Sequence, residues 1–219
     1  MALSKTPELE KTDNPKTHIS YDEFLRIYSN GERLEWVNGR IVKMAAVTFM
    51  HESVRGFLYA IMREYVAVKN LGIVACEPYN VKLGYNLPGR SPDIMFIAQI
   101  NITRVLDAHL DGAPDLIVEV LSPKTRRIDK VEKFREYQQA GVREYWILDP
   151  KRESQEFYVR DGTGVFQREV TDAKGIYHCP TIDGFWIKTE WLWQNPQLTV
   201  IQIAREWGCL LYTSDAADE

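Results

Sequence analysis

The chain has 219 residues, of which 45% are apolar and 26% are charged, a composition typical of a single soluble globular domain. Its longest apolar runs are far shorter than the roughly 18 residues that cross a bilayer, and residues 1–18 are too polar for a signal peptide, so we expect a cytoplasmic protein without a membrane segment. The formal net charge of -4 excludes a surface that is basic all round, so any face that binds nucleic acid must be local.

The N-terminal region is predicted to begin with a disordered tail and to continue into a helix and a hairpin. Residues 1–17 are polar and have almost nothing to bury. Ser20 or Asp22 can cap a short helix that extends to Tyr28. Residues 34–37, the turn Asn38-Gly39 and residues 40–42 then have the pattern of an N-terminal β-hairpin, because Asn-Gly favours the tight turns that join twisted strands.

The central part of the chain has the pattern of one long helix and several strands. Between residues 52 and 69 the apolar residues recur at helical spacing, which predicts a helix with one buried stripe. Short strands are predicted at residues 73–76, 79–83 and 93–97. The continuous apolar run at residues 116–121 is typical of a buried central strand.

Ser122-Pro123 is expected to end this strand, and a helix is predicted from residue 127 to 140, with Gly141 after its end. A strand at residues 144–148 follows. The order of helix, three strands, helix and strand predicts an α/β fold: a mixed sheet with an αβββαβ core and helices on its faces. Residues 156–159 and 165–166 alternate around an Asp-Gly turn and predict a C-terminal accessory hairpin, and the aromatic residues 186–193 are expected to pack back on the domain.

The last residues of the chain are not expected to belong to the fold. Residues 209–219 read CLLYTSDAADE, which resembles a translated sequencing adapter, although a real acidic tail is the alternative. We therefore assign the domain to residues 18–208. The other cysteines, Cys76 and Cys179, have neither the C-x-x-C spacing of zinc sites nor the dense usage of disulfide scaffolds, so neither zinc nor a disulfide is expected.

Glu119 and Asp93 are the candidate metal ligands. Glu119 interrupts the apolar run at residues 116–121, where an unpaired carboxylate is costly to bury, so it needs a cation or an exposed edge position. Asp93 stands at the head of a second apolar strand. Two carboxylates on adjacent strands can share a Mg²⁺ ion, which keeps several waters for chemistry on a phosphodiester. Asp115 competes for this role, but it is expected to lie too far along the strand and to serve the strand start.

A catalytic cation is sought on the helix at residues 127–140. The position two residues after the glutamate, where such sites often carry lysine, is Leu121. Asp129, Lys133 and Tyr137 are spaced by four residues and share one helix face, so Lys133 can lean toward the strand ends. The alternative is a surface ion pair between Asp129 and Lys133.

His51 and Glu35 are weaker candidates. His51 lies just before the predicted long helix and can contact a phosphate or a water, although a single histidine is more often structural. Glu35 can also be the exposed side of an alternating strand. Residues 124–133, with three lysines and two arginines, are either a local phosphate-binding face or ordinary charge at a helix start.

A long ordered pattern links these candidates. It runs over residues 17–159 and includes Glu35, Asn38-Gly39, His51, Pro92-Asp93, GAPDLIVEVLSP at residues 112–123, Asp129, Lys133, Tyr137, Gly141-Val142 and Glu144-Tyr145-Trp146. It resembles the Uma2 family of restriction-endonuclease-like proteins.

The resemblance implies a PD-(D/E)-x-K nuclease core with Asp93 and Glu119 as the metal pair and the basic role moved to Lys133. It also implies that Glu35 and His51 belong to the pocket.

Three functions remain open at this point. The first is a Mg²⁺-dependent endonuclease that cuts DNA, with Mn²⁺ as a substitute ion. The second is a catalytically inactive module with the nuclease fold that binds nucleic acid or a protein partner, as the missing lysine and the acidic charge favour. The third is a nuclease acting on RNA. A homodimer is expected only by analogy with double-strand cutters that pair two active sites.

Overall fold

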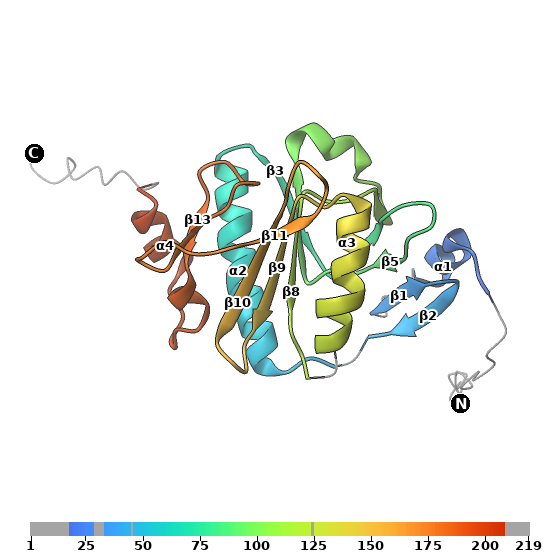
Figure 1. Cartoon of the computed structure of the whole chain (residues 1–219), viewed down its shortest axis with the longest axis horizontal. Helices are drawn as coiled ribbons and strands as arrows, with labels where there is room; N and C mark the ends of the chain where they lie inside the picture. Colours follow the sequence, from blue (N-terminus) through green and yellow to red (C-terminus); the bar gives the residue numbers. More distant parts are fainter. Residues whose placement is uncertain (1–17, 29–32, 45, 124, 209–219) are drawn as a thin grey trace, which may run out of the picture.

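A six-stranded mixed sheet forms the centre of the fold in a computed structural model, which describes residues 18–28, 33–44, 46–123 and 125–208 (Figure 1). Along the sheet the strands follow in the order β11 (Phe166–Glu169), β10 (Ser154–Arg160), β9 (Glu144–Asp149), β8 (Leu116–Val120), β6 (Ile94–Ala98) and β3 (Gly72–Cys76). The central pair of β9 and β8 is parallel, and the other neighbours are antiparallel.

Helices cover both faces of this sheet (Figure 1). The helix α2 (Phe49–Val68) precedes β3, β6 and β8, and the segment η2 (Ile128–Lys133) with α3 (Phe134–Ala140) connects β8 to β9. A parallel pair needs such a crossover because its strands cannot be joined by a tight turn. The predicted mixed α/β fold, with its order of helix, three strands, helix and strand, is confirmed.

The helix α2 is anchored by a cap and by one apolar stripe. Thr48 caps it, since its hydroxyl accepts a hydrogen bond of 3.2 Å from the backbone N–H of His51. Val54, Leu58 and Ile61 are buried against the sheet, as their spacing predicts. None of the helices in the described ranges is long and apolar enough to cross a membrane.

The predicted helix at residues 127–140 has the expected extent but not the expected regularity. Its first half, η2, has the i→i+5 pattern of a π-helix, and only α3 is α-helical. Short π-helical segments often occur at functional sites. Gly141 ends the helix with φ 88°, the left-handed conformation that glycine adopts at helix ends.

Alternation along β8 decides which way Glu119 points. Val118 and Val120 belong to the core beneath α2, whereas Ile117 and Leu121 belong to the core on the side of α3. Because successive side chains of a strand point to opposite faces, Glu119 lies on the side of α3. This apolar strand therefore delivers one carboxylate toward the helix that carries Lys133.

A second sheet of five strands holds the N-terminal region and was not predicted as a separate unit. The helix α1 (Tyr21–Tyr28) packs near it, and Ser20 caps that helix. Asn38 and Gly39 have φ of 50° and 77°, so the predicted hairpin with its tight turn is confirmed. The strand predicted at residues 79–83 lies in this sheet and not in the central one. Along this second sheet the strands follow in the order β2 (Arg40–Lys43), β1 (Leu34–Val37), β5 (Gly89–Arg90), β4 (Asn80–Lys82) and β7 (His109–Asp111).

The C-terminal part extends and covers the central sheet. The predicted C-terminal accessory hairpin is confirmed as β10 and β11, and it extends the central sheet beyond β9. The buried carboxylate of Glu144 accepts hydrogen bonds from Trp146, Tyr177 and Cys179 and ties the later segments to β9. The tails predicted at residues 1–17 and 209–219 lie outside the described residues. The remaining elements are η1 (Gln99–Arg104), β12 (Ile176–His178), β13 (Trp186–Lys188), η3 (Thr189–Leu192) and α4 (Val200–Glu206).

Gly72 gives a direct test of the pairing of β3 with β6. It has φ 146°, and a Cβ there would lie 2.0 Å from the carbonyl oxygen of Ile97. We expect Gly72→Ala to lower the free energy of unfolding by more than about 2 kcal/mol. Gly56→Ala in α2, where a Cβ meets nothing within 4 Å, should instead raise it by up to about 1 kcal/mol. Denaturant unfolding of both variants measures this contrast, and similar effects would contradict the strand register.

Candidate active site

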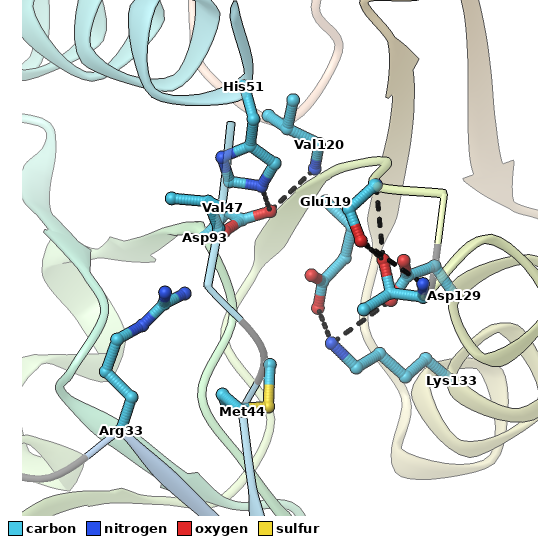
Figure 2. A pocket seen from close by; sticks show the side chains of 11 residues that line it. Arg33, Met44, Val47, His51, Asp93, Glu119, Val120, Asp129 and Lys133 are labelled. Carbon is cyan, nitrogen blue, oxygen red and sulfur yellow. Dashed lines mark hydrogen bonds and ion pairs between the residues drawn. The ribbon is translucent and has the colours of Figure 1, made fainter. Parts of the chain in front are cut away.

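Asp93 and Glu119 line the same cavity at one end of the central sheet (Figure 2). Ile94 pairs with Val118 across β6 and β8, so the next position along this antiparallel register sets Asp93 opposite Glu119. The Oδ2 atom of Asp93 accepts a hydrogen bond of 2.7 Å from the backbone N–H of Val120. Two separate strands therefore bring one acidic residue each to the same place.

Both carboxylates line a narrow cavity. Its volume is about 20 Å³, which is enough for a water or a small ion. Asp93 is 6% exposed and Glu119 is 3% exposed. The other lining residues are Arg33, Met44, Val47, His51, Val120, Ser122, Thr125, Asp129 and Lys133.

Lys133 reaches into this cluster from the π-helical segment. Its Nζ atom lies 2.9 Å from Oε1 of Glu119, 3.2 Å from Oδ1 of Asp129 and 3.5 Å from Oε1 of Glu35. Tyr137 donates a second hydrogen bond of 2.6 Å to Oε1 of Glu119. The pair of Asp129 and Lys133 exists, but both side chains are buried, so the alternative of a surface ion pair was wrong.

Electrostatics around Glu119 favour an additional cation. Burial raises the pKa of Glu119 well above its usual value, Lys133 offsets this in part, and the carboxylates of Asp129 and Asp93 add to the rise. Burial opposes the charge of Lys133, but the carboxylates of Glu119, Glu35 and Asp129 outweigh it and hold the Lys133 pKa well above its usual value. Several acidic groups thus share one ammonium ion, and positive charge brought into the cavity would relieve their repulsion.

His51 lies across the cavity from this lysine, at the start of α2. Its Nε2 atom is 3.3 Å from Oδ2 of Asp93. Its Nδ1 atom is buried and has no hydrogen-bond partner in the described part of the chain. An unpartnered buried polar atom is uncommon, and it often marks a place for a water or a ligand.

Glu35 lies behind Lys133 and does not line the cavity. It is 2% exposed, so the alternative of an exposed strand position was wrong. Its carboxylate binds Arg90 at 2.8 Å, and Arg90 also binds Glu136 of α3 at 2.7 and 2.8 Å. Burial raises the pKa of Glu35, but the charges of Lys133 and Arg90 bring it below its usual value.

Several residues of this cluster escaped the sequence reasoning. Arg90 and Glu136 were not singled out, and Asp129 was placed on the helix face of Lys133 and Tyr137 but was given no role in the site. The one available signal for Arg90 is its position in a short polar segment three residues before Asp93. Asp115, the competing acidic residue, lies elsewhere: it accepts hydrogen bonds from the backbone N–H of Ala98 at 2.8 Å and from the Asn101 amide at 3.0 Å.

The basic stretch at residues 124–133 does not form a continuous free basic face. Arg126 pairs with Asp149, Lys130 pairs with Glu156 at 2.6 Å, and Lys133 is buried. Arg127 is exposed, and residue 124 lies outside the described residues. Most of the described charges in this stretch therefore have acidic partners within the fold.

The acidic pair fits a hard divalent ion with few protein ligands. Among the described residues, no group of three or more His, Cys, Asp or Glu side chains is placed to hold a metal. Asp93 and Glu119 remain as a pair, and no hydrogen bond from the described residues reaches Oδ1 of Asp93 or Oε2 of Glu119. Magnesium suits such a site, because it is usually bound by one or two carboxylates and keeps several waters.

Comparison with solved structures shows that this mixed α/β fold is shared with a known structure. One match is a crystal structure from Anabaena variabilis described as "a putative nuclease belonging to DUF820". It has a TM-score of 0.65 and 18% sequence identity, and the match covers 80% of this chain and 97% of that one. At this identity the likeness establishes the fold alone. A search of curated proteins gave no match.

The sequence itself places the chain in a family of nucleases. Residues 21–190 match the family model Uma2, whose description is "Putative restriction endonuclease". This range contains the three sheets of the described residues, including the pair of β12 and β13, and all the cavity residues. The chain belongs to the Uma2 family.

Proposed function

We propose that this protein is a Mg²⁺-dependent endonuclease that hydrolyses phosphodiester bonds in DNA. One observation carries the proposal: carboxylates from two adjacent strands line the same cavity, and the ammonium group of Lys133 lies 2.9 Å from one of them. The family description and the fold support nuclease chemistry in general. We further propose that the protein acts in the cytoplasm.

Asp93 and Glu119 would hold the divalent ion. When bound, Mg²⁺ supplies polarisation of the scissile phosphate and makes a water easier to deprotonate, and Mn²⁺ can substitute for it. The protein's own contribution is to fix the ligands. The backbone N–H of Val120 and the imidazole of His51 both contact Oδ2 of Asp93, which sets the direction of its carboxylate.

Lys133 provides the fixed positive charge of the proposed site. In many related sites a lysine follows the glutamate by two residues, but here that position is Leu121. The Nζ atom of Lys133 instead reaches Glu119 from the neighbouring helical segment. An ammonium held there can orient the attacking water and neutralise charge that develops on the phosphate. Glu35 would act indirectly, by positioning Lys133 from behind.

A catalytically inactive binding module is the second candidate. It is favoured by the ion pairs of Lys133, which engage this cavity lysine with three carboxylates before any substrate arrives. Such a module would bind nucleic acid or a protein partner without turnover. The two candidates differ in their metal affinity, because only the nuclease needs a tightly bound ion.

Cleavage of supercoiled plasmid tests the proposed activity. We expect the purified protein to nick plasmid in the presence of Mg²⁺ or Mn²⁺ and to stop when a chelator removes the ion. The same assay with single-stranded DNA and with RNA defines the substrate class, and sedimentation of the protein tests for a homodimer. Nicking that continues unchanged in excess chelator would contradict the proposed metal dependence.

A further inference from the structure

A second and larger pocket lies at the same end of the central sheet as the candidate active site, where α2 begins. Its volume is about 330 Å³. Its walls come from the first turns of α2, from the turn between β9 and β10, and from the segment that follows η3. In Figure 1 the start of α2 and the turn after β9 lie together at the lower end of the sheet. His51 of the active-site cavity directly follows Phe49 and Met50 of this pocket, so the two hollows share the first turn of α2.

The pocket presents apolar side chains where a helix start is usually polar. Phe49 is 89% exposed and Met50 is 55% exposed, and both line the pocket. Trp193 lines it from the opposite segment and is half-buried. An exposed aromatic face is a surface on which a nucleobase can stack.

Polar groups in the pocket lining supply both hydrogen-bond donors and hydrogen-bond acceptors. Gln194 and Asn195 are exposed at the pocket, and a side-chain amide offers a donor and an acceptor, as a base edge requires. Gln197 is held in place, since its amide donates a hydrogen bond of 3.2 Å to the carbonyl of Ser53 in α2. Aromatic faces and free amides in one hollow match the two surfaces of a base.

The turn between β9 and β10 carries exposed charges of both signs next to the pocket, with the acidic Glu153 in its wall. Pro150 and Glu153 line the pocket, and Lys151 and Arg152 between them are exposed. Arg152 has only a distant contact with an acidic group, at 4.0 Å from Asp149. Exposed lysine and arginine contribute sequence-independent attraction to a phosphate backbone.

We propose that this pocket binds an unpaired nucleobase next to the phosphate held at the active-site cavity. The inference rests on the proposed nuclease function and names its substrate class: a single strand, or a duplex with a frayed or flipped base. Phe49 stacks on the base, the amides of Gln194 and Asn195 contact its edge, and Lys151 and Arg152 contact the backbone. A base inside a regular duplex cannot reach such a pocket without leaving the stack.

Fluorescence anisotropy with a labelled mixed-sequence DNA single strand in chelator tests the pocket independently of cleavage. We expect Phe49→Ala to weaken binding at least about fivefold, because base–aromatic stacking contributes that much per base. Phe49→Tyr should restore it. The matched control is Tyr85→Ala, which removes an aromatic ring that is 96% exposed in the loop between β4 and β5, outside both hollows. It should leave binding unchanged.

Two further measurements separate the outcomes. A strand of abasic residues should bind more weakly to the unaltered protein than the normal strand does. Phe49→Ala and the unaltered protein should bind the abasic strand with the same affinity. Equal affinities of Phe49→Ala and the unaltered protein for the normal strand would overturn the base pocket, and Mg²⁺-dependent plasmid nicking in that case would leave the nuclease intact. A stacking effect of Phe49 without cleavage in any metal would support the pocket and overturn the nuclease.

Discussion

Glu119→Gln is expected to lower Mg²⁺-dependent cleavage by at least about 100-fold while the protein stays folded. The amide keeps an oxygen that can accept the hydrogen bonds of Lys133 and Tyr137, so the local scaffold is retained. It removes the negative charge that would hold the ion. It also removes the repulsion with Asp93 and Asp129, so the free energy of unfolding should change by less than about 1 kcal/mol.

The matched control for Glu119→Gln is the same substitution at a glutamate outside the site. Glu169→Gln changes an exposed residue of β11 and should leave both cleavage and stability unaltered. Glu119→Ala should also lose cleavage, with a larger loss of stability, because it leaves Lys133 and Tyr137 without one acceptor. Initial rates of plasmid nicking at saturating Mg²⁺ and thermal unfolding give the two readouts. Full cleavage by Glu119→Gln would put the activity elsewhere in the protein.

Arg90→Met is expected to lower the free energy of unfolding by about 3–5 kcal/mol, the largest stability effect that we predict. Arg90 is 2% exposed and joins Glu35 of β1 to Glu136 of α3. Methionine leaves the carboxylate of Glu35 buried with less positive charge around it. Because Glu35 also contacts Lys133, the substitution should loosen the lysine as well as the packing of the N-terminal sheet against α3.

An exposed arginine provides the control. Arg143 is 63% exposed in its side chain and lies 3.9 Å from Asp115, so Arg143→Met should cost less than about 1 kcal/mol. Adding Glu35→Gln to Arg90→Met should recover part of the loss, because it removes the buried charge that lacks its partner. Denaturant unfolding of the three variants measures this. Equal costs of Arg90→Met and Arg143→Met would show that the buried network contributes little.

The acidic pair was predictable because strands restrict where side chains can point. Glu119 lies inside a continuous apolar run, and Asp93 lies at the head of another apolar strand. In a packed sheet, strand geometry and the cost of burying a charge leave few positions for such carboxylates. The face that they share follows from the alternation of β8 and β6. For Lys133 only the helix face could be predicted, because four-residue spacing selects a face of the helix but does not say how deeply the side chain is buried.

Other parts of the fold depend on contacts between distant segments and left little signal in the sequence. The strand β5 has two residues and β4 and β7 have three each, which is too short for a periodic pattern. The second sheet was therefore missed, and with it the place of Arg90. The π-helical turn of η2 has no recognised sequence signal either, and it forms the start of the helix where Asp129 and Lys133 meet.

The proposed chemistry depends on one divalent ion shared by a carboxylate from each of two strands, and calorimetric titration with Mn²⁺ measures this directly. The unaltered protein should bind Mn²⁺, and Asp93→Asn and Glu119→Gln should each weaken binding at least about tenfold, whereas Asp115→Asn should affect it far less. Unchanged Mn²⁺ affinity in both site variants, or no binding by the unaltered protein, would contradict the nuclease assignment and leave the binding module as the better account.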